Sequence, residues 1–338
     1  MRKVVGALAL ITLSAAGSAA QQAGSSDIKS LHVQGNVWML VGPVSNAVVQ
    51  IGDDGVLVVD AMMEQHADAM VAEIKRLAGP DKIIRYLINT HVHPDHTGGN
   101  EKVAGAGRTI VAGNFAGQVA AESPATIIAH ENVLNRMSAP TGKQSSRPTA
   151  AWPSDSFFDE QKDLFFNGEG VELIHIPAAH TDGDVMVYFR KSDVLATGDL
   201  YVNNTFPIVM TAEGGNYNGI LTALNRIIDI CIPRDKEEGG TFVVPGHGRL
   251  ADEADVVDYR DMATVIHDRF ADAVKRGMTL EQVKNAKLVQ DYARWASNSG
   301  FWTTDKFVEA VYESLKPKPA PAAPKAPAAT AKPAGGKK

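Results

Sequence analysis

The chain has 338 residues, 44% of them hydrophobic and 21% charged, and a formal net charge of −6 at pH 7. Residues 1–20 and 316–338 together carry eight Lys and Arg residues and no Asp or Glu, so residues 21–315 carry −14. This acidic body argues against a nucleic-acid substrate, because phosphate binding depends on Lys and Arg, while the length and hydrophobic content suit a large buried core.

The N-terminal end has the pattern of a secretory signal peptide. Arg2 and Lys3 precede an apolar stretch, residues 4–16, that is too short for a stable membrane span. Ser18 and Ala20 then supply the small residues that a signal peptidase requires, which predicts cleavage after Ala20 and a mature protein in the periplasm or outside the cell. An uncleaved membrane anchor is the alternative. No later stretch is long and apolar enough to predict stable membrane insertion.

The remaining elements are predicted from periodicity and turn residues. In the first half we expect short strands across 36–61, a helix at 64–79, strands at 82–89 and 108–113, a helix at 115–137 and a long loop at 138–156. In the second half we expect strands at 164–167, 171–177, 184–190 and 193–199, a helix at 219–231, a strand at 241–247 and a helical extension over about 252–315. The strands occur in two groups along the chain, and each group is followed by helices. This order predicts an α+β architecture in which two sheets pack together and helices cover their outer faces.

The C-terminal end and the one cysteine carry little evident chemistry. Residues 316–338 are mostly Pro, Ala and Lys and contain no aromatic or branched apolar residue, so we expect a disordered basic tail. Such a tail either contacts an anionic surface or only adds solubility. Cys231 is the only cysteine of the sequence, so an internal disulfide is ruled out. Its apolar neighbours at helical spacing favour a buried thiol over a nucleophile.

A histidine cluster follows the predicted strand at 82–89, in the segment THVHPDHTGG. His91 and His93 are two positions apart, so in extended backbone they point the same way and can bind one ion. Asp95 and His96 come after Pro94, which turns the chain, and can therefore face a second ion. The alternative is a surface loop that is rich in histidine and binds no metal.

Three more candidate ligands lie where later predicted strands end. His180 follows the strand at 171–177, Asp199 ends the strand at 193–199, and His247 follows the strand at 241–247. Loops on a rigid scaffold commonly carry function, so these positions complete the expected metal sites. The histidines without ligand partners at useful spacing are not expected to bind metal: His32, His66, His130, His175 and His267.

The order His-x-His-x-Asp-His, then His-Thr, Gly-Asp and Gly-His resembles the metallo-β-lactamase fold superfamily over roughly residues 30–250. The resemblance implies an αββα sandwich of two mixed sheets flanked by helices, with a two-metal site at one edge. It implies zinc as the metal, with iron or manganese left open. It also implies the ligand assignment: His91, His93 and His180 on one ion, Asp95, His96 and His247 on the other, and Asp199 bridging both. Asp60 resembles an aspartate that such proteins place next to the metal ligands at this strand end. The alternative is that Asp60 is an ordinary turn residue.

The combination of His96 and Asp199 is closer to glyoxalase II and lactonases than to zinc β-lactamases, one group of which carries Arg and Cys there. The resemblance implies a hydrolase in which a metal-bridged hydroxide, oriented by Asp95, attacks the carbonyl of an ester, lactone, β-lactam or thioester. Two alternatives remain: a mononuclear iron enzyme similar to persulfide dioxygenases, and a non-catalytic metal-binding accessory protein of the cell envelope. The expected partner is a small-molecule substrate. Its identity and the oligomeric state stay open.

Two loops are candidates for the walls of a substrate pocket. The segment after Asp199 contains Tyr201, Phe206 and Tyr217, and the loop at 138–156 contains Trp152. These aromatic residues either line a mostly apolar pocket or serve as packing. Neither loop contains a clear cluster of positive residues that would bind a carboxylate or phosphate.

Overall fold

The computed structural model describes residues 28–110, 123–141, 144–145 and 147–317. The predicted signal peptide and the predicted tail beyond residue 317 lie outside these ranges. Within them, no helix has both the length and the apolar character needed to cross a membrane.

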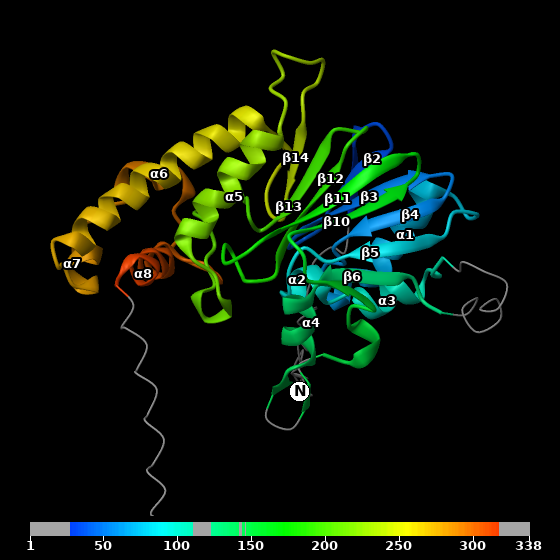
Figure 1. Ribbon diagram of the computed structural model, residues 1–338, viewed down its shortest axis with the longest axis horizontal. Coiled ribbons are helices and arrows are strands. Elements are labelled where there is room, and N and C mark those ends of the chain that lie inside the picture. Colours follow the sequence, from blue (N-terminus) through cyan, green and yellow to red (C-terminus); the bar gives the residue numbers. More distant parts are fainter. Residues whose placement is uncertain (1–27, 111–122, 142–143, 146, 318–338) are drawn as a thin grey trace, which may run out of the picture.

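Two mixed sheets form the centre of the described structure (Figure 1). The first sheet has the strand order β1 (Lys29–Gln34), β2 (Val37–Val41), β3 (Asn46–Gly52), β4 (Gly55–Val59), β5 (Ile84–Ile88), β6 (Thr126–His130) and β9 (Asp155–Phe157). The second has the order β10 (Gln161–Phe166), β11 (Glu169–Ile176), β12 (Asp184–Phe189), β13 (Val194–Gly198), β14 (Phe242–Pro245) and β15 (Ala251–Asp252). A small separate hairpin pairs β7 (Pro140–Thr141) with β8 (Gln144–Ser145).

Helices cover the outer face of each sheet (Figure 1). Those of the first half are η1 (Glu64–His66), α1 (Ala67–Ala78), α2 (Pro94–Thr97), α3 (Asn100–Gly105), α4 (Glu131–Ser138) and η3 (Thr149–Ala151). Those of the second half are η4 (Thr211–Glu213), α5 (Tyr217–Ile230), α6 (Glu253–Lys275), α7 (Leu280–Asn285), η5 (Gln290–Trp295) and α8 (Thr304–Leu315). α1 and α3 lie on the side of the first sheet, and α5 and α6 on the side of the second.

The alternation of side chains along β4 explains the layered packing. Leu57 and Val59 belong to the core between the two sheets, whereas Val56 and Val58 belong to the core under α1 and α3. Successive side chains of a strand point to opposite faces, so an unbroken apolar run can fill two cores at once. The αββα sandwich expected from the sequence is therefore confirmed.

Three local predictions were wrong. Residues 126–130 of the helix expected at 115–137 form β6, while 131–138 form α4 and 115–122 lie outside the described residues. Residues 108–110 of the strand expected at 108–113 are not in a strand, and the rest of that segment is not described. The loop expected at 138–156 contains β7, β8, η3 and β9, and β1 was not anticipated.

Candidate metal centre

The candidate ligands lie where strands of the two sheets end. Asp60 follows β4 directly, and the histidine segment follows β5, which is parallel to β4. His180 follows β11, Asp199 follows β13, and His247 follows β14, which is parallel to β13. The carboxyl ends of parallel strands meet at one edge, which is why residues far apart in the sequence come together there.

Two glycines allow the strand ends to approach one another. Gly198 has φ +50°, and a Cβ at this position would lie 2.5 Å from Thr90 Oγ1. A Cβ at Gly246 would lie 2.1 Å from Asp199 Oδ1. Because side chains cannot fit at either position, the backbone packs directly against the site.

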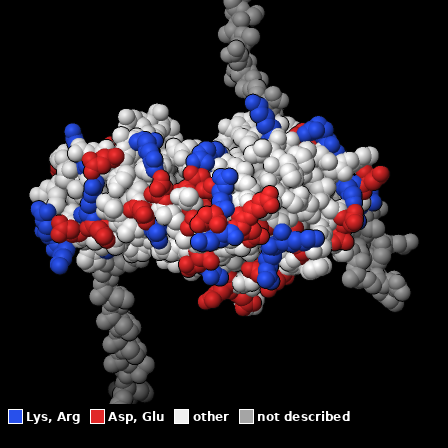
Figure 2. Space-filling view, turned by 90° about the horizontal axis from the view of Figure 1, so that it is seen from above, with Lys and Arg blue, Asp and Glu red and all other residues white. Residues whose placement is uncertain are grey.

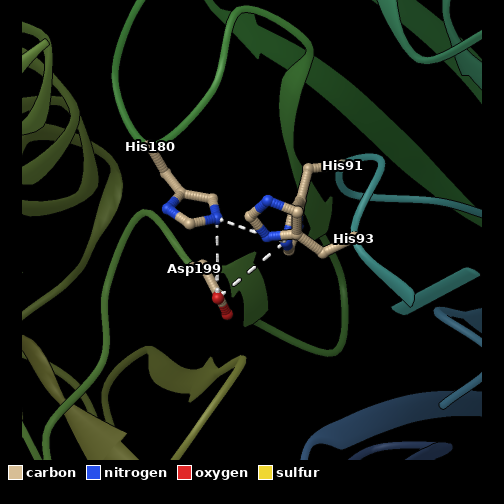
Figure 3. Close-up of side chains that lie close together, drawn as sticks. All are labelled: His91, His93, His180 and Asp199. Carbon is tan, nitrogen blue, oxygen red and sulfur yellow. Dashed lines mark hydrogen bonds and ion pairs between the residues drawn. The ribbon is translucent and has the colours of Figure 1, made fainter. Parts of the chain in front are cut away.

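His91, His93, His180 and Asp199 form the first group (Figure 3). His93 Nδ1 lies 3.1 Å from His91 Nε2 and 3.0 Å from His180 Nε2. Asp199 Oδ2 lies 3.6 Å from His180 Nε2 and 3.9 Å from His91 Nε2. Zinc bonds of about 2.0–2.1 Å in a tetrahedron place neighbouring ligand atoms roughly 3.3 Å apart. The group therefore has the dimensions of a metal site.

Asp95, His96 and His247 form the second group. Asp95 Oδ2 lies 3.3 Å from His247 Nε2 and 3.6 Å from His96 Nε2. Pro94 occupies the first turn of α2, where its fixed φ favours a helix start, and this turn directs Asp95 and His96 toward the group. Asp199 Oδ1 lies 3.3 Å from His96 Nε2, and its Oδ2 lies 3.3 Å from His247 Nε2. The Asp199 carboxylate thus lies between the two groups.

Each of the five histidines turns its outer ring nitrogen toward an oxygen. The pairs are His91 Nδ1 with Thr90 Oγ1, His93 Nε2 with Glu213 Oε2, His96 Nδ1 with Asp60 Oδ2, His180 Nδ1 with the Ile208 carbonyl, and His247 Nδ1 with the Val44 carbonyl, at 2.7–3.1 Å. Carbonyl and carboxylate oxygens only accept, and the Thr90 hydroxyl already donates to Asp60. The outer nitrogens therefore donate, and in the neutral rings the inner nitrogens present lone pairs to the centre.

Two buried polar atoms that make no hydrogen bond fit metal binding. His96 Nε2 and Asp199 Oδ1 are buried and have no hydrogen-bond partner among the described residues, although they lie 3.3 Å from each other as an ion pair. A buried polar atom that makes no hydrogen bond normally costs about 1–3 kcal/mol. Divalent ions at the two groups would satisfy both atoms, so the side chains present here fit a divalent metal.

The electrostatics of the site favour a cation. Burial lowers the pKa of His180 to about 4, so this ring is neutral at pH 7 and its Nε2 can bind a metal. Burial would also lower the pKa of His247, but the Asp199 carboxylate outweighs it and raises this pKa to about 10. Burial would raise the pKa of Asp199, yet His247 and His96 hold it well below its usual value. The Asp199 carboxylate, whose negative charge stabilises the protonated His247 ring, would also attract a metal ion.

Asp60 contacts the site as the resemblance implied. Its carboxylate accepts hydrogen bonds from the Thr90 amide (2.8 Å), the Thr90 hydroxyl (2.7 Å) and His96 Nδ1 (2.7 Å). Its φ of +64° is left-handed, a region that Asp and Asn tolerate better than other residues with side chains.

We expect Asp60→Asn to lower zinc affinity at the group containing His96 by about 10–100-fold, the usual cost of losing such a support. Asn keeps the shape and tolerates the backbone, but its amide cannot accept all three hydrogen bonds. Zinc titration against a chromogenic chelator would measure the change. Unchanged affinity would show that Asp60 is only a turn residue.

The structure places the other singled-out residues away from the two groups. His175 stacks on His130 with ring centroids 3.6 Å apart, and no other described histidine outside the ligand set joins either group. Cys231 is buried, and burial raises the pKa of its thiol to about 12, which agrees with an unreactive core residue.

The aromatic residues that could line a pocket or serve as packing pack against the hydrophobic clusters. Tyr201, Phe206 and Tyr217 are at most 1% exposed and pack between the second sheet and the helices. Trp152 packs against the cluster of Ala129, Val133, Met137 and Ala151. Of the two roles left open for these four residues, packing is the one that the structure shows. Other residues of the segment after Asp199, among them Thr205 and Ile208, do line a cavity beside the site.

Sequence reasoning missed Glu213, which accepts a 2.8 Å hydrogen bond from His93 Nε2. It lies in η4, 120 positions after His93, and no local pattern marks it. The hydrogen bond to His93 lowers the pKa of Glu213, so the carboxylate stays ionised. Thr90 was also missed, although its place directly before His91 could have suggested it.

One curated protein is similar to about half of the chain. The alpha subunit of 2,4-dinitroanisole O-demethylase from Nocardioides sp. (strain JS1661) is 24% identical over 178 residues. The match covers 52% of this chain and 48% of that protein, so the chain spans about half the length of the curated relative it matches.

Solved structures share the fold. The sec-alkylsulfatase Pisa1 from Pseudomonas sp. has a TM-score of 0.62 and 16% identity, over 85% of this chain and 50% of that chain. A metallo-beta-lactamase from Pontibacter korlensis has a TM-score of 0.52 and 17% identity, over 70% of this chain and 99% of that chain. At these identities the likeness shows the fold alone. The family model of the metallo-beta-lactamase superfamily matches residues 40–224, and the chain therefore belongs to that superfamily.

Proposed function

We propose that the protein is an exported hydrolase that binds two zinc ions and cleaves a small ester, lactone, β-lactam or thioester. The observation that carries the proposal is the Asp199 carboxylate, which lies between two groups of inward-facing histidine nitrogens and the Asp95 carboxylate. Binding one ion would not require both groups. The proposal that the protein is exported depends only on the signal-peptide pattern at the N-terminal end of the sequence.

The side chains have distinct roles in this proposal. If the two groups held divalent ions, the ions would supply a water of lowered pKa and would polarise the bond to be cleaved. Asp95 lines the cavity beside the site. Burial would raise its pKa, but His247 and His96 outweigh burial and lower it, so the ionised carboxylate can orient water. Glu213 and Asp60 hold His93 and His96 in the orientation that presents their lone pairs.

The surface and the relatives bear on the substrate. Positive and negative side chains are intermixed on the face shown in Figure 2, without one continuous positive area that would suit nucleic acid. The curated relative's name describes O-demethylation of 2,4-dinitroanisole. With 24% identity over about half of each chain, this name only adds an aryl ether to the substrates worth assaying.

Metal analysis tests the two-ion proposal. Protein purified with zinc and passed through a desalting column should retain close to two zinc ions per chain by elemental analysis, because two complete groups are present. One iron per chain, with oxygen consumption on a persulfide, would instead support the iron enzyme. Metal without turnover of any substrate would support the accessory protein.

A further inference from the structure

A cavity of about 630 Å³ lies against both groups of candidate ligands. Four of the seven candidate ligands form part of its wall, namely His93, Asp95, Asp199 and His247. Its volume is in the range of pockets that hold small organic molecules. The rest of its wall therefore bears on which substrate can reach the site.

Away from the candidate ligands, most of the wall is apolar. Its apolar members are Val44, Met63, Pro94, Ile208, Met210, Phe301 and Trp302, and its uncharged polar members are Asn204, Thr205, Ser297 and Ser299. The charged members are carboxylates: Glu213 joins Asp95 and Asp199, and no Lys or Arg is among the lining residues that the structure describes. A substrate group that extends away from the metals would meet mainly apolar surface, a few uncharged polar groups and no Lys or Arg side chain of the wall. An anion there would lose hydration without gaining an oppositely charged partner from the wall.

Two apolar side chains of the cavity wall are exposed to solvent. Val44 is 49% exposed and Phe301 is 64% exposed, and they come from distant parts of the chain. Val44 also offers its carbonyl to His247, so this part of the wall is tied to the site. An apolar substrate group in contact with either of them would cover hydrophobic surface that water now contacts.

The segment that carries Phe301 and Trp302 is held in place at its base. The Thr304 amide donates to the Ser297 carbonyl at 2.7 Å, and the Ser297 amide donates to Thr304 Oγ1 at 3.1 Å. Lys306 donates to the Phe301 carbonyl at 2.6 Å and lies 5.3 Å from the Phe301 ring, but is not part of the cavity wall. A wall ordered in advance binds its ligand with a smaller entropic cost.

The same segment lies outside the part of the chain that the family model matches, residues 40–224. The ligand groups thus come mainly from the shared fold, whereas one wall of the cavity comes from the C-terminal helical region. Function depends on the residues of a site more than on the fold that carries it, so this wall bears on which substrate the site accepts.

We infer that the site prefers an uncharged substrate whose apolar group, remote from the cleaved bond, lies against Phe301 and Trp302, and that it rejects a substrate with an anion at that remote end. This inference rests on the proposed function for the chemistry of the cleaved bond. It does not depend on which of the four acyl linkages is cleaved.

Binding of three hydroxamates to the zinc-loaded protein tests the inference without turnover. Acetohydroxamate has the metal-binding group alone, octanohydroxamate adds an apolar chain, and suberic acid monohydroxamate has a chain of the same carbon number ending in a carboxylate. Isothermal titration calorimetry, with zinc content checked afterwards, gives each Kd. We expect octanohydroxamate to bind at least about tenfold more tightly than either of the other two.

Phe301→Ser and a matched control locate the effect. Phe301→Ser should reduce the octanoyl-to-acetyl affinity ratio by about tenfold. Phe158→Ser removes a phenyl ring that is 73% exposed and is not part of the cavity wall, so the ratio should remain as in the unaltered protein. The same ratio should appear in kcat/KM for 4-nitrophenyl acetate and octanoate if esters are cleaved.

The outcomes separate this inference from the proposed function. Equal affinity for the three hydroxamates, tighter binding of the suberate compound, or a Phe301→Ser variant with an unchanged ratio would overturn the inference, even if esters are hydrolysed. The expected affinities without hydrolysis of any acyl substrate would support the apolar wall and contradict the hydrolase proposal.

Discussion

Asp199→Ala should remove one zinc ion per chain and lower kcat/KM by more than about a hundredfold. Loss of a residue that only hydrogen-bonds to a metal ligand lowers metal affinity or activity by about 10–100-fold. Loss of a carboxylate that lies between both ligand groups should therefore lower activity further. Its oxygens lie 3.3 Å from His96 Nε2 and His247 Nε2. His91, His93 and His180 would remain, and three protein ligands plus water form a complete zinc site.

Elemental analysis, turnover and circular dichroism measure this prediction together. Asp68→Ala is the control, because the Asp68 side chain is 81% exposed and pairs only with Lys102 among the described salt bridges. It should keep both ions. If Asp199→Ala keeps two zinc ions and most of its activity, the bridging assignment is wrong. The site would then be more similar to lactamases that lack this aspartate, and a β-lactam would be the first substrate to assay.

Phe307→Ala should strongly destabilise the folded protein. Phe307 in α8 is fully buried and stacks on Phe206 with ring centroids 4.5 Å apart. Its removal leaves a cavity, and such truncations cost about 3–5 kcal/mol in the free energy of unfolding. For a chain of this size, Tm should fall by roughly 6–15 °C.

Thermal unfolding followed by circular dichroism measures the shift. Phe158→Ala provides the matched control, since Phe158 is 73% exposed and its loss should change stability by no more than about 0.5 kcal/mol. Similar Tm values for both variants would show that α8 does not stabilise the segment after Asp199. α8 would then also not be expected to hold the wall segment with Phe301 and Trp302 in place.

The metal-site residues could be predicted because their pattern is local and chemical. His91 to His96 lie within one short segment, and His180, Asp199 and His247 each follow an apolar run of strand length. The structure brings all seven together, although their role as ligands remains a prediction. Glu213 could not be predicted, because its contact with His93 depends on how η4 packs, and the sequence does not show such a distant pairing.

The sequence left the role of the loop aromatic residues open for a different physical reason. An aromatic residue in a loop can face the core or a cavity, and both positions favour the same residue types. Tyr201 and Phe206 face the core, whereas Trp302, which the sequence did not single out, faces the cavity. Likewise, the apolar run in β6 is too short for periodicity to distinguish a strand from a helix.

Turnover of one substrate panel shows whether the protein performs metal-dependent acyl hydrolysis. The panel contains chromogenic esters, a lactone, a thioester and a β-lactam, each assayed with zinc-loaded protein, after chelation and after zinc is restored. We predict that at least one acyl substrate is hydrolysed, that chelation abolishes turnover, and that zinc restores it. Turnover that survives complete metal removal, or none on any substrate by protein that retains two zinc ions, would contradict this account.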